Sequence, residues 1–251
     1  MDSKEKFNDK VSEYRKYRPD YPSEFINYLI KDVGIHGDAI LADIGAGTGI
    51  LTQQLGNKVK KIWAVEPNRQ MGRACQEYCS DLGNFTLVGG SAEETGLPNQ
   101  SVDYITAAQA FHWFDKGKTK SEFQRILKSH GKVILVWNSR EPESELISEN
   151  EKILKNICPE YKGFSDGSTI SPNAYDDFFK NGQCEYKVFG NDRFLTLESF
   201  IGASLSASYA PRRTDDNYPL FVKTLTDLFN RYSKQGKMLL PYQTRSYVGQ
   251  L

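Results

Sequence analysis

The stretch Ala39-Ile40-Leu41-Ala42-Asp43-Ile44-Gly45-Ala46-Gly47-Thr48-Gly49-Ile50-Leu51-Thr52 decides the fold. An apolar run breaks into three alternate glycines and restarts as a second apolar segment, which predicts a strand, a loop and a helix. A chain bends this sharply only where residues without a Cβ allow it. The same lack of side chains lets a ligand reach backbone N–H groups. The loop is therefore a candidate site for a nucleotide-like ligand.

The spacing of the glycines indicates which class of nucleotide-like ligand the loop would bind. A dinucleotide loop of the form G-x-G-x-x-G would need its third glycine at position 50, which is Ile50. No G-K-[ST] follows, so a P-loop is excluded. The pattern is instead Asp43 followed by glycines at 45, 47 and 49, and a second apolar run, 61–65, ends in Glu66. A carboxylate at the tip of a second strand can accept hydrogen bonds from both hydroxyls of a ribose.

Several ordered motifs then carry a family resemblance. They are Asp43 to Gly49, Ala64-Val65-Glu66-Pro67-Asn68, Gly90 to Pro98, Val102-Asp103-Tyr104-Ile105 and Ala108 to Phe114. Together they resemble the motifs of class I S-adenosylmethionine-dependent methyltransferases of the type 11 kind. The N-terminal segment and the His-Trp loop are similar to those of trans-aconitate methyltransferases. The resemblance implies S-adenosyl-L-methionine as cofactor, S-adenosyl-L-homocysteine as product and a Rossmann-like seven-stranded sheet, mostly parallel with an antiparallel last strand.

Composition sets limits on partners and location. The 251 residues carry 32 basic and 32 acidic side chains, so no global field draws the chain to nucleic acid or to an anionic membrane. The longest aliphatic or aromatic run, 133–137, is too short to span a bilayer, and no secretory leader opens the chain. We therefore expect a cytoplasmic location. The four cysteines show no zinc spacing, so no metal is expected, and Cys75 and Cys79 are interpreted as buried thiols.

Strands alternate with helices along the first half of the chain. The first strand lies before the glycine loop, and further strands are expected at 61–66, 85–88, 102–108 and 132–138. Helices are expected at 22–33, 48–55, 68–80 and 118–128. This alternation predicts an α/β fold, with a mostly parallel sheet covered by helices on both faces. Two further strands, 184–191 and 238–248, should close the sheet, the second ending an antiparallel hairpin at its edge. Helices expected at 141–157, 173–180, 197–205 and 220–232 form a cap.

We interpret residues 1–251 as one domain. A lid segment occupies 1–21, the cofactor-binding core 34–140, and the cap and substrate elements 141–182 and 196–235. Ligands of such sheets bind beyond the carboxyl ends of the strands. The resemblance then assigns cofactor contacts to Tyr14, Tyr17, Arg18, Asp43, Gly45, Ala46, Gly47, Thr48, Gly49, Glu66, Pro67, Met71, Ser91, Ala92, Glu93, Gln109 and Ala110.

Some of these assignments have competing interpretations. Tyr14 and Tyr17 fit a surface helix as well as a segment folded over the cofactor, whereas Arg18 could hold the methionine carboxylate through bidentate hydrogen bonds. Met71 fits a core position as well as a contact to adenine. Glu93 fits a solvated loop charge equally well.

The loop 109–114 should line the gap between cofactor and acceptor. The faces of Phe111, Trp113 or Phe114 would stabilise a positively charged sulfur. His112 is the candidate catalytic base, or else a group that orients its neighbours by hydrogen bonding. Substrate contacts are expected from Trp113, Phe114, Asn138, Arg140, Tyr209 and Arg212.

The acceptor is expected to be a small molecule. The loop lacks the [DNS]-P-P-[YFW] run of adenine amino methyltransferases, and no Pro-Cys pair offers a nucleophile for pyrimidine chemistry, so nucleic acid is not expected. If the acceptor is a small acid, one of Arg140, Tyr209 and Arg212 should hold its carboxylate. Two alternatives stay open, a protein that binds the cofactor without turnover and an NAD(P)-dependent oxidoreductase. A monomer and a homodimer are both compatible with the sequence.

Overall fold

A computed structural model describes residues 18–141, 143–163, 171–207 and 209–251. Tyr14 and Tyr17 lie outside these residues. Within them, seven strands form one sheet in the order β3-β2-β1-β4-β5-β9-β6. The strands are β1 Ile40–Ile44, β2 Lys61–Val65, β3 Phe85–Val88, β4 Val102–Ala108, β5 Leu127–Arg140, β6 Glu185–Gly190 and β9 Tyr242–Gly249. No helix in the described ranges is both long and apolar enough to cross a membrane.

The first five strands are parallel, as the alternation of strands and helices predicts. β1 pairs in parallel with β2 on one side and with β4 on the other, and β5 pairs in parallel with β4. The direction in which strands are added to the sheet changes between β1 and β4. From β1 the chain adds β2 and then β3 on one side, and it then crosses to the other side of β1 to add β4 and β5. Ligands of open α/β sheets bind at this kind of switch point, beyond the carboxyl ends of the strands.

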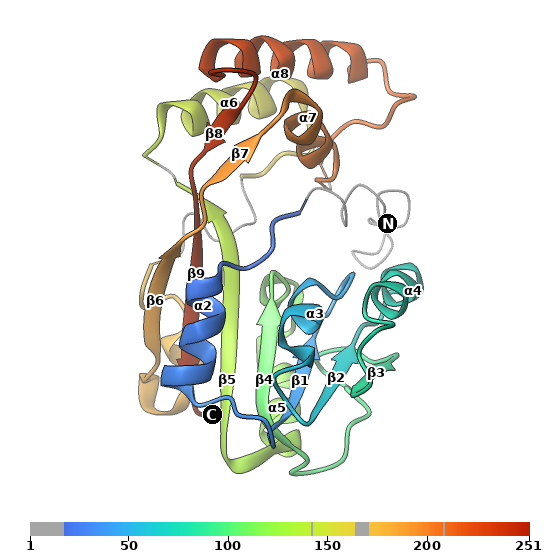
Figure 1. Cartoon of the computed structure of the whole chain (residues 1–251), viewed down its shortest axis with the longest axis vertical. Coiled ribbons are helices and arrows are strands. Elements are labelled where there is room, and N and C mark those ends of the chain that lie inside the picture. Colours follow the sequence, from blue (N-terminus) through green and yellow to red (C-terminus); the bar gives the residue numbers. More distant parts are fainter. Residues whose placement is uncertain (1–17, 142, 164–170, 208) are drawn as a thin grey trace.

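Helices cover both faces of the sheet (Figure 1). On one face, α2 Ser23–Tyr28, its continuation η2 Leu29–Val33 and α3 Ile50–Gly56 share an apolar cluster with β1, β5 and β9. α4 Arg69–Tyr78 contributes Cys75 and Tyr78 to a smaller cluster with β2 and β3. On the other face, α5 Lys116–Ile126 contributes Phe123 and Ile126 to the largest cluster. These helices correspond to the predicted ones, with ends that differ by a few residues.

The closing strands differ from the prediction in one respect. β6 and β9 pair antiparallel, as expected, but β9 lies between β5 and β6, so β6 and not the last strand forms the edge. Burial explains this order, because six of the eight residues of β9 are buried, whereas those of β6 are exposed or half-buried. A strand that is buried on both faces is stable inside the sheet, where neighbours satisfy its backbone on both sides.

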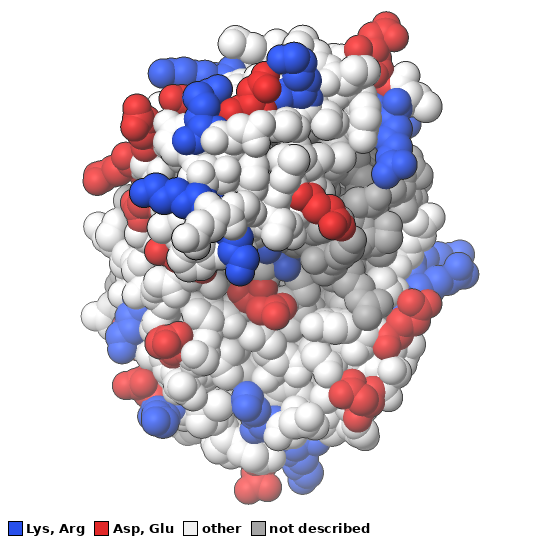
Figure 2. All heavy atoms as spheres, turned by 45° about the horizontal axis from the view of Figure 1, so that its top comes forward, with Lys and Arg blue, Asp and Glu red and all other residues white. Residues whose placement is uncertain are grey.

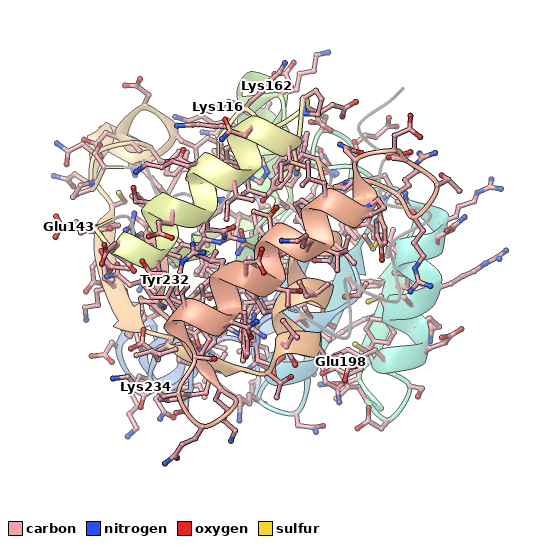
Figure 3. All side chains as sticks on the ribbon, turned by 90° about the horizontal axis from the view of Figure 1, so that it is seen from above. Lys116, Glu143, Lys162, Glu198, Tyr232 and Lys234 are labelled. Atoms are coloured by element: carbon pink, nitrogen blue, oxygen red, sulfur yellow. The ribbon has the colours of Figure 1, made fainter. Side chains whose placement is uncertain are left out.

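The cap lies beyond the carboxyl ends of the parallel strands (Figure 1). It contains α6 Glu145–Ile157, α7 Leu197–Leu205, α8 Tyr218–Tyr232 and a two-stranded ribbon, β7 Arg193–Leu195 with β8 Met238–Leu240, which the sequence did not predict. Figure 3 shows α6 and α8 side by side across the top of the molecule. The hydroxyl of Tyr232 on α8 donates to Glu149 on α6 at 3.0 Å.

The helix predicted at 173–180 was wrong. The structure has two short 3-10 turns there instead, η4 Asp176–Phe178 and η5 Lys180–Gly182. Tyr175, Phe178 and Phe179 are all buried in the cluster that contains α5, against the sheet and not within the cap. Because these rings sit close together in the chain and all pack inward, a 3-10 turn suits them better than one stripe of an α-helix.

Candidate functional site

The glycine loop turns directly after β1. The backbone N–H groups of Gly45 and Ala46 donate to the carbonyl of Val65 at the end of β2, at 2.8 and 3.2 Å. Gly45 has a φ of +69°, and a Cβ at this position would lie 2.6 Å from the Cβ of Ala110. The absence of a side chain therefore lets the glycine loop touch the loop after β4. The loops after β1 and β4, which the sequence predicts at neighbouring strand ends, are therefore in contact.

Gly49 is the N-cap residue of α3, and two cysteines at the end of α4 lie close to it. A Cβ on Gly49 would lie 2.8 Å from the sulfur atoms of both Cys75 and Cys79, closer than real Cβ atoms come. Both thiols are fully buried and free, as predicted, and Cys79 donates to the carbonyl of Gly49 at 3.6 Å. The cysteines thus pack the two helices together at the base of the loop.

Asp43 lies at the end of β1 with both carboxylate oxygens satisfied. The hydroxyls of Thr52 and Thr106 donate to them at 2.7 and 2.8 Å, and Asp43 is 1% exposed. Burial raises the pKa of the Asp43 carboxyl, and the two threonine hydroxyls oppose that rise. These two hydrogen bonds hold Asp43 in place, and Asp43 in turn fixes the backbone where the glycine loop begins.

Glu66 follows β2 and reaches back to the glycine loop. Its Oε2 accepts the N–H of Gly47 and its Oε1 accepts the N–H of Asn68, both at 2.8 Å. Burial raises the pKa of the Glu66 carboxyl, and these two backbone hydrogen bonds partly offset the rise. Each carboxylate oxygen can accept more than one hydrogen bond, so the group still has acceptor capacity for a ligand beside the loop.

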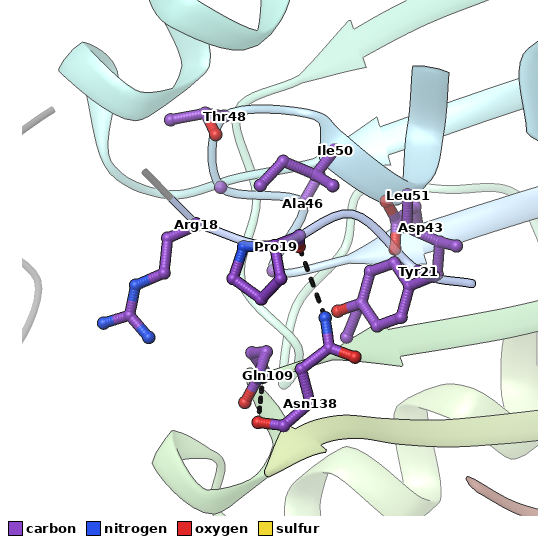
Figure 4. A pocket seen from close by; sticks show the side chains of 13 residues that line it. Arg18, Pro19, Tyr21, Asp43, Ala46, Thr48, Ile50, Leu51, Gln109 and Asn138 are labelled. Carbon is purple, nitrogen blue, oxygen red and sulfur yellow. Dashed lines mark hydrogen bonds between the residues drawn. The ribbon is translucent and has the colours of Figure 1, made fainter. Parts of the chain in front are cut away.

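A pocket opens above the loop (Figure 4). Eight predicted site residues line it, namely Arg18, Asp43, Gly45, Ala46, Gly47, Thr48, Gln109 and Asn138. The hydroxyl of Thr48 is buried, and no described residue hydrogen-bonds to it. A buried hydroxyl without a partner is costly, so this position suits a polar ligand at the start of α3. The residues therefore fit a nucleoside cofactor of the kind that the sequence predicts.

The segment before α2 closes one side of this pocket. The Asn138 side chain at the end of β5 donates to the carbonyl of Pro19 at 3.3 Å (Figure 4). It also donates to the carbonyl of Asp20 at 3.3 Å. Asn191 donates to the Asp20 carbonyl and to Asn138 Oδ1, at 3.1 Å each. Gln109 donates to the backbone carbonyl of Asn138 at 2.8 Å. Sequence reasoning placed Asn191 at the end of the predicted strand 184–191 but gave it no role, since nothing in the sequence shows that this strand end lies beside Asn138.

Neither Glu66 nor the residues predicted to contact adenine line this pocket. Met71 and Ala92 are buried at 5% and 3% exposure, the former on α4. Ser91 donates its N–H to the Glu94 carbonyl within a turn. Glu93 accepts the N–H of Asp115 at 2.9 Å, which ties this turn to the N-terminus of α5. Pro67 precedes Asn68, the residue whose side chain caps α4.

The loop after β4 ends in a 3-10 turn, η3 Phe111–Trp113. Phe111 is fully buried among aromatic rings, including Phe178 at a centroid distance of 4.6 Å, so it belongs to the core. Trp113 is 45% exposed, and Phe114 lies near Gly45. Phe114 therefore lies against the glycine loop, although neither Trp113 nor Phe114 lines the pocket.

His112 is exposed and contacts the core through one ring nitrogen. The indole N–H of Trp137 donates to Nδ1 of His112 at 3.4 Å. A ring nitrogen that accepts a hydrogen bond carries no proton, so this contact assigns the proton of the neutral ring to Nε2. The arrangement favours His112 as a donor that orients a neighbour over His112 as a base at Nδ1.

The predicted substrate residues of the cap separate in the structure. Arg140 ends β5 and lines a second pocket beneath the cap. Tyr209 packs edge-on against Tyr161 at 4.9 Å, and Arg212 is exposed, with its N–H donating to Asp215. Neither Tyr209 nor Arg212 lines the two pockets. Figure 2 shows basic and acidic side chains interspersed over the face toward the cap.

Comparison with known proteins supports one family. A family model described as a methyltransferase domain matches residues 42–135, which span β1 to β5. An uncharacterized methyltransferase-like protein of Schizosaccharomyces pombe is 26% identical over 248 residues, 96% of this chain and 93% of the relative. An uncharacterized methyltransferase of Mycobacterium tuberculosis is 33% identical over 148 residues, so the match covers 59% of this chain and 58% of that protein.

Solved structures agree on the fold. A candidate type II methyltransferase from Anaeromyxobacter dehalogenans superposes with a TM-score of 0.68 at 20% identity, over 93% of this chain and 98% of that one. The agreement in sheet order, glycine loop and relatives leads to one conclusion. Residues 42–135 are similar to a methyltransferase domain, and the described chain has the Rossmann-like fold of the methyltransferase structures that it resembles.

Proposed function

We propose that the protein transfers a methyl group from S-adenosyl-L-methionine to a small-molecule acceptor and releases S-adenosyl-L-homocysteine. The observation that carries this proposal is the convergence of the glycine loop, Gln109 and Asn138 on one pocket that contains the hydroxyl of Thr48, which has no hydrogen-bond partner among the described residues. When bound, the cofactor supplies a methyl group on a positively charged sulfur, which an acceptor atom displaces in line.

In this proposal, Glu66 accepts hydrogen bonds from the ribose, because its carboxylate is held beside Gly47 and retains acceptor capacity. Met71, Ser91, Ala92 and the neighbouring turn contact the adenine. Arg18 holds the cofactor carboxylate, since it lines the pocket from the lid segment. The chain thus contributes binding and orientation, which supply much of the rate in a displacement between two bound partners.

The acceptor reaches the pocket from beneath the cap. Trp113 and Phe114 exclude water and face the positive charge, whereas His112 Nε2 donates a hydrogen bond that orients the acceptor. An acceptor that carries a carboxylate would place it near Arg140, the predicted substrate residue that lines the second pocket. The separate apolar cluster of the cap supports its assignment as the substrate element. A cytoplasmic location, the absence of a nucleic-acid partner and the oligomeric state stay predictions.

A labelled-methyl assay tests the proposal. The purified chain is incubated with S-adenosyl-L-methionine labelled in its methyl group and with a panel of small acids, phenols and amines. We expect label in at least one acceptor, and added S-adenosyl-L-homocysteine should suppress the transfer. Cofactor binding without transfer to any member of the panel would favour the alternative of a binding protein without turnover.

A further inference from the structure

The β7-β8 ribbon presents an apolar face to solvent. Phe194 and Leu239 are direct cross-strand partners in this ribbon, so their side chains lie on the same face. Phe194 is 70% exposed and Leu239 is 43% exposed. The residues next to this pair, Leu195, Met238 and Leu240, are buried in the cluster of the cap. One face of the ribbon is thus packed, and the other has an apolar pair where an antiparallel ribbon normally has polar residues.

The exposed pair belongs to a larger apolar hollow. Phe194 and Leu239 line it together with Leu146, Tyr232 and Pro241, and its walls come from the ribbon, the start of α6, the end of α8 and the turn between α8 and β8. No described residue lines both this hollow and either of the two pockets. Contiguous exposed apolar side chains of this kind mark an interaction site, whereas single ones are ordinary. We call the residues that line the hollow the ribbon surface.

The ribbon surface carries charges of both signs. Glu145 lies at the start of α6, whereas Lys234 and Lys237 lie in the turn between α8 and β8. All three are exposed and line the hollow, and none of the ion pairs between described residues includes them. Figure 3 shows Lys234 and Tyr232 on the same side of the molecule as Glu143, which precedes α6. These charges are therefore available to a partner.

The two signs of charge lie at opposite ends of β8. Lys237 directly precedes the strand. At the other end, the carbonyl of Pro241 accepts the N–H of Glu141, in the segment that leads to Glu145 at the start of α6. Leu239 lies between these two ends, on the exposed face. The ribbon surface therefore has an apolar centre, an acidic end and a basic end.

Such a surface is complementary to itself. A two-fold rotation about an axis through the apolar centre brings the acidic end of one copy to the basic end of the other, and does so at both ends. The apolar side chains are then buried inside a charged rim, which is the usual anatomy of a specific interface. An unrelated partner would need the same mixed pattern, which this chain already carries.

We propose that the ribbon surface is a dimer interface between two copies of this chain, with a two-fold axis close to Phe194 and Leu239. Glu145 of each copy faces Lys234 and Lys237 of the other copy. Because no residue of the ribbon surface lines the cofactor pocket, this dimer does not depend on the proposed reaction.

The dimer would also support the cap. Arg193 and Leu240, which adjoin the exposed pair in the two strands, line the second pocket. Two strands of three residues each are only marginally stable by themselves. A second copy packed against the outer face of the ribbon holds these strands in place, and with them one wall of the second pocket.

Sedimentation velocity of the full chain over a range of concentrations tests the dimer. We expect a concentration-dependent change from monomer to dimer and no larger species, since a two-fold interface is closed. Phe194→Asp places a charge in the apolar centre and should leave the chain monomeric. Leu220→Asp, at an apolar position on α8 that is 56% exposed and outside the ribbon surface, is the matched control and should dimerise as the parent does. Urea denaturation checks that both variants are folded.

A pair of charge variants tests the two-fold arrangement and leaves the apolar centre intact. Glu145→Lys places like charges at both ends of its own dimer, and the double variant Lys234→Glu with Lys237→Glu does the same with the opposite sign. Each should weaken its own dimer by about tenfold or more, because like charges that meet across an interface repel. Mixed in equal amounts, the two should form a heterodimer, since both ends are then complementary. Added salt should weaken that heterodimer.

The outcomes separate the proposed interface from other contacts. A parent chain that stays monomeric at every concentration would overturn the proposal, and so would a dimer that Phe194→Asp leaves intact. Growth into larger species would also overturn it, because such growth indicates a contact between two different surfaces. If the charge variants are folded but form no heterodimer when mixed, the two-fold arrangement is overturned. A heterodimer from two variants that are each monomeric alone would support it.

Discussion

Glu66 accepts the backbone N–H of Gly47 at 2.8 Å, so the carboxylate at the tip of β2 is fixed against the glycine loop that follows β1. The same side chain accepts the N–H of Asn68, whose own side chain caps α4. One carboxylate therefore connects the loop, the second strand and the following helix. A ligand that hydrogen-bonds to Glu66 is placed relative to all three elements.

Glu66→Ala should weaken the binding of S-adenosyl-L-homocysteine by about tenfold or more, because charged hydrogen bonds to the ribose are lost. Glu66→Gln keeps the shape and should lose less. Glu77→Ala, at an exposed position on α4, is the control and should bind as the parent does. Calorimetry measures all three. An unchanged affinity for Glu66→Ala would mean that the ribose lies elsewhere.

The pH dependence of cofactor binding follows from the same carboxyl. Because burial raises the pKa of Glu66 above the ordinary value of 4.5, the group takes up its proton at a higher pH than an exposed glutamate does. Protonation removes acceptor capacity, so the affinity for S-adenosyl-L-homocysteine should fall as the pH is lowered through the raised pKa. Titrations across acidic pH measure this fall, and Glu66→Gln should flatten it. A parent affinity that stays constant down to pH values near 4.5 would contradict the assignment.

Asn191→Ala should loosen the lid segment, since Asn191 donates both to the Asp20 carbonyl and to Asn138. We expect a loss of roughly 1 kcal/mol of unfolding free energy for these hydrogen bonds, and a several-fold weaker binding of cofactor. Asn230→Ala, exposed on α8, is the control for removing an asparagine side chain. Urea denaturation and calorimetry measure the two effects. Weaker binding without any loss of stability would indicate a direct contact between Asn191 and the ligand.

Gly49→Ala should destabilise the protein, because the added Cβ meets the buried sulfur atoms of Cys75 and Cys79 and because φ is +85° at this position. Overpacking of this kind costs about 1–3 kcal/mol in unfolding free energy. Gly37→Ala adds the same methyl group where nothing lies within 4 Å and should have little effect. Chemical denaturation compares the two. Equal stabilities would mean that α3 and α4 have room to separate.

The turn after β3 depends on a charged network. The N–H and hydroxyl of Thr95 donate to Glu122, and the Arg125 guanidinium beside Glu122 lowers the pKa of that carboxyl to about 2. Because the pKa of Glu122 is lower in the folded protein than the ordinary value of 4.5, its ionised carboxylate stabilises the folded state at pH values above 4.5. That contribution is lost as the pH falls toward 2.

Glu122→Gln should therefore lower the unfolding free energy at pH 7 by roughly 1–3 kcal/mol, the scale of hydrogen bonds to a charged group, and by much less at pH 3. Glu151→Gln removes an exposed carboxylate paired with Lys155 and should change little. Urea denaturation at both pH values gives the comparison. A loss for Glu122→Gln that is equal at pH 7 and pH 3 would contradict the ionised pair.

The sequence predicted the cofactor half of the fold because its signals are local. Asp43, the alternate glycines and Glu66 lie within 24 residues, and each strand of the parallel sheet has its own apolar run. The substrate half was harder to predict. β7 pairs with β8, more than 40 residues later in the chain, and both are only three residues long. No periodicity identifies strands that short, so Arg193, which begins β7 and lines the second pocket, was missed.

The central claim is that the pocket above the glycine loop takes a sulfonium cofactor and not a dinucleotide. Titration of the chain with S-adenosyl-L-homocysteine and, separately, with NADH tests it most directly. We predict saturable heat with S-adenosyl-L-homocysteine that Glu66→Ala weakens, and no saturable heat with NADH. Saturable binding of NADH alone would contradict the account.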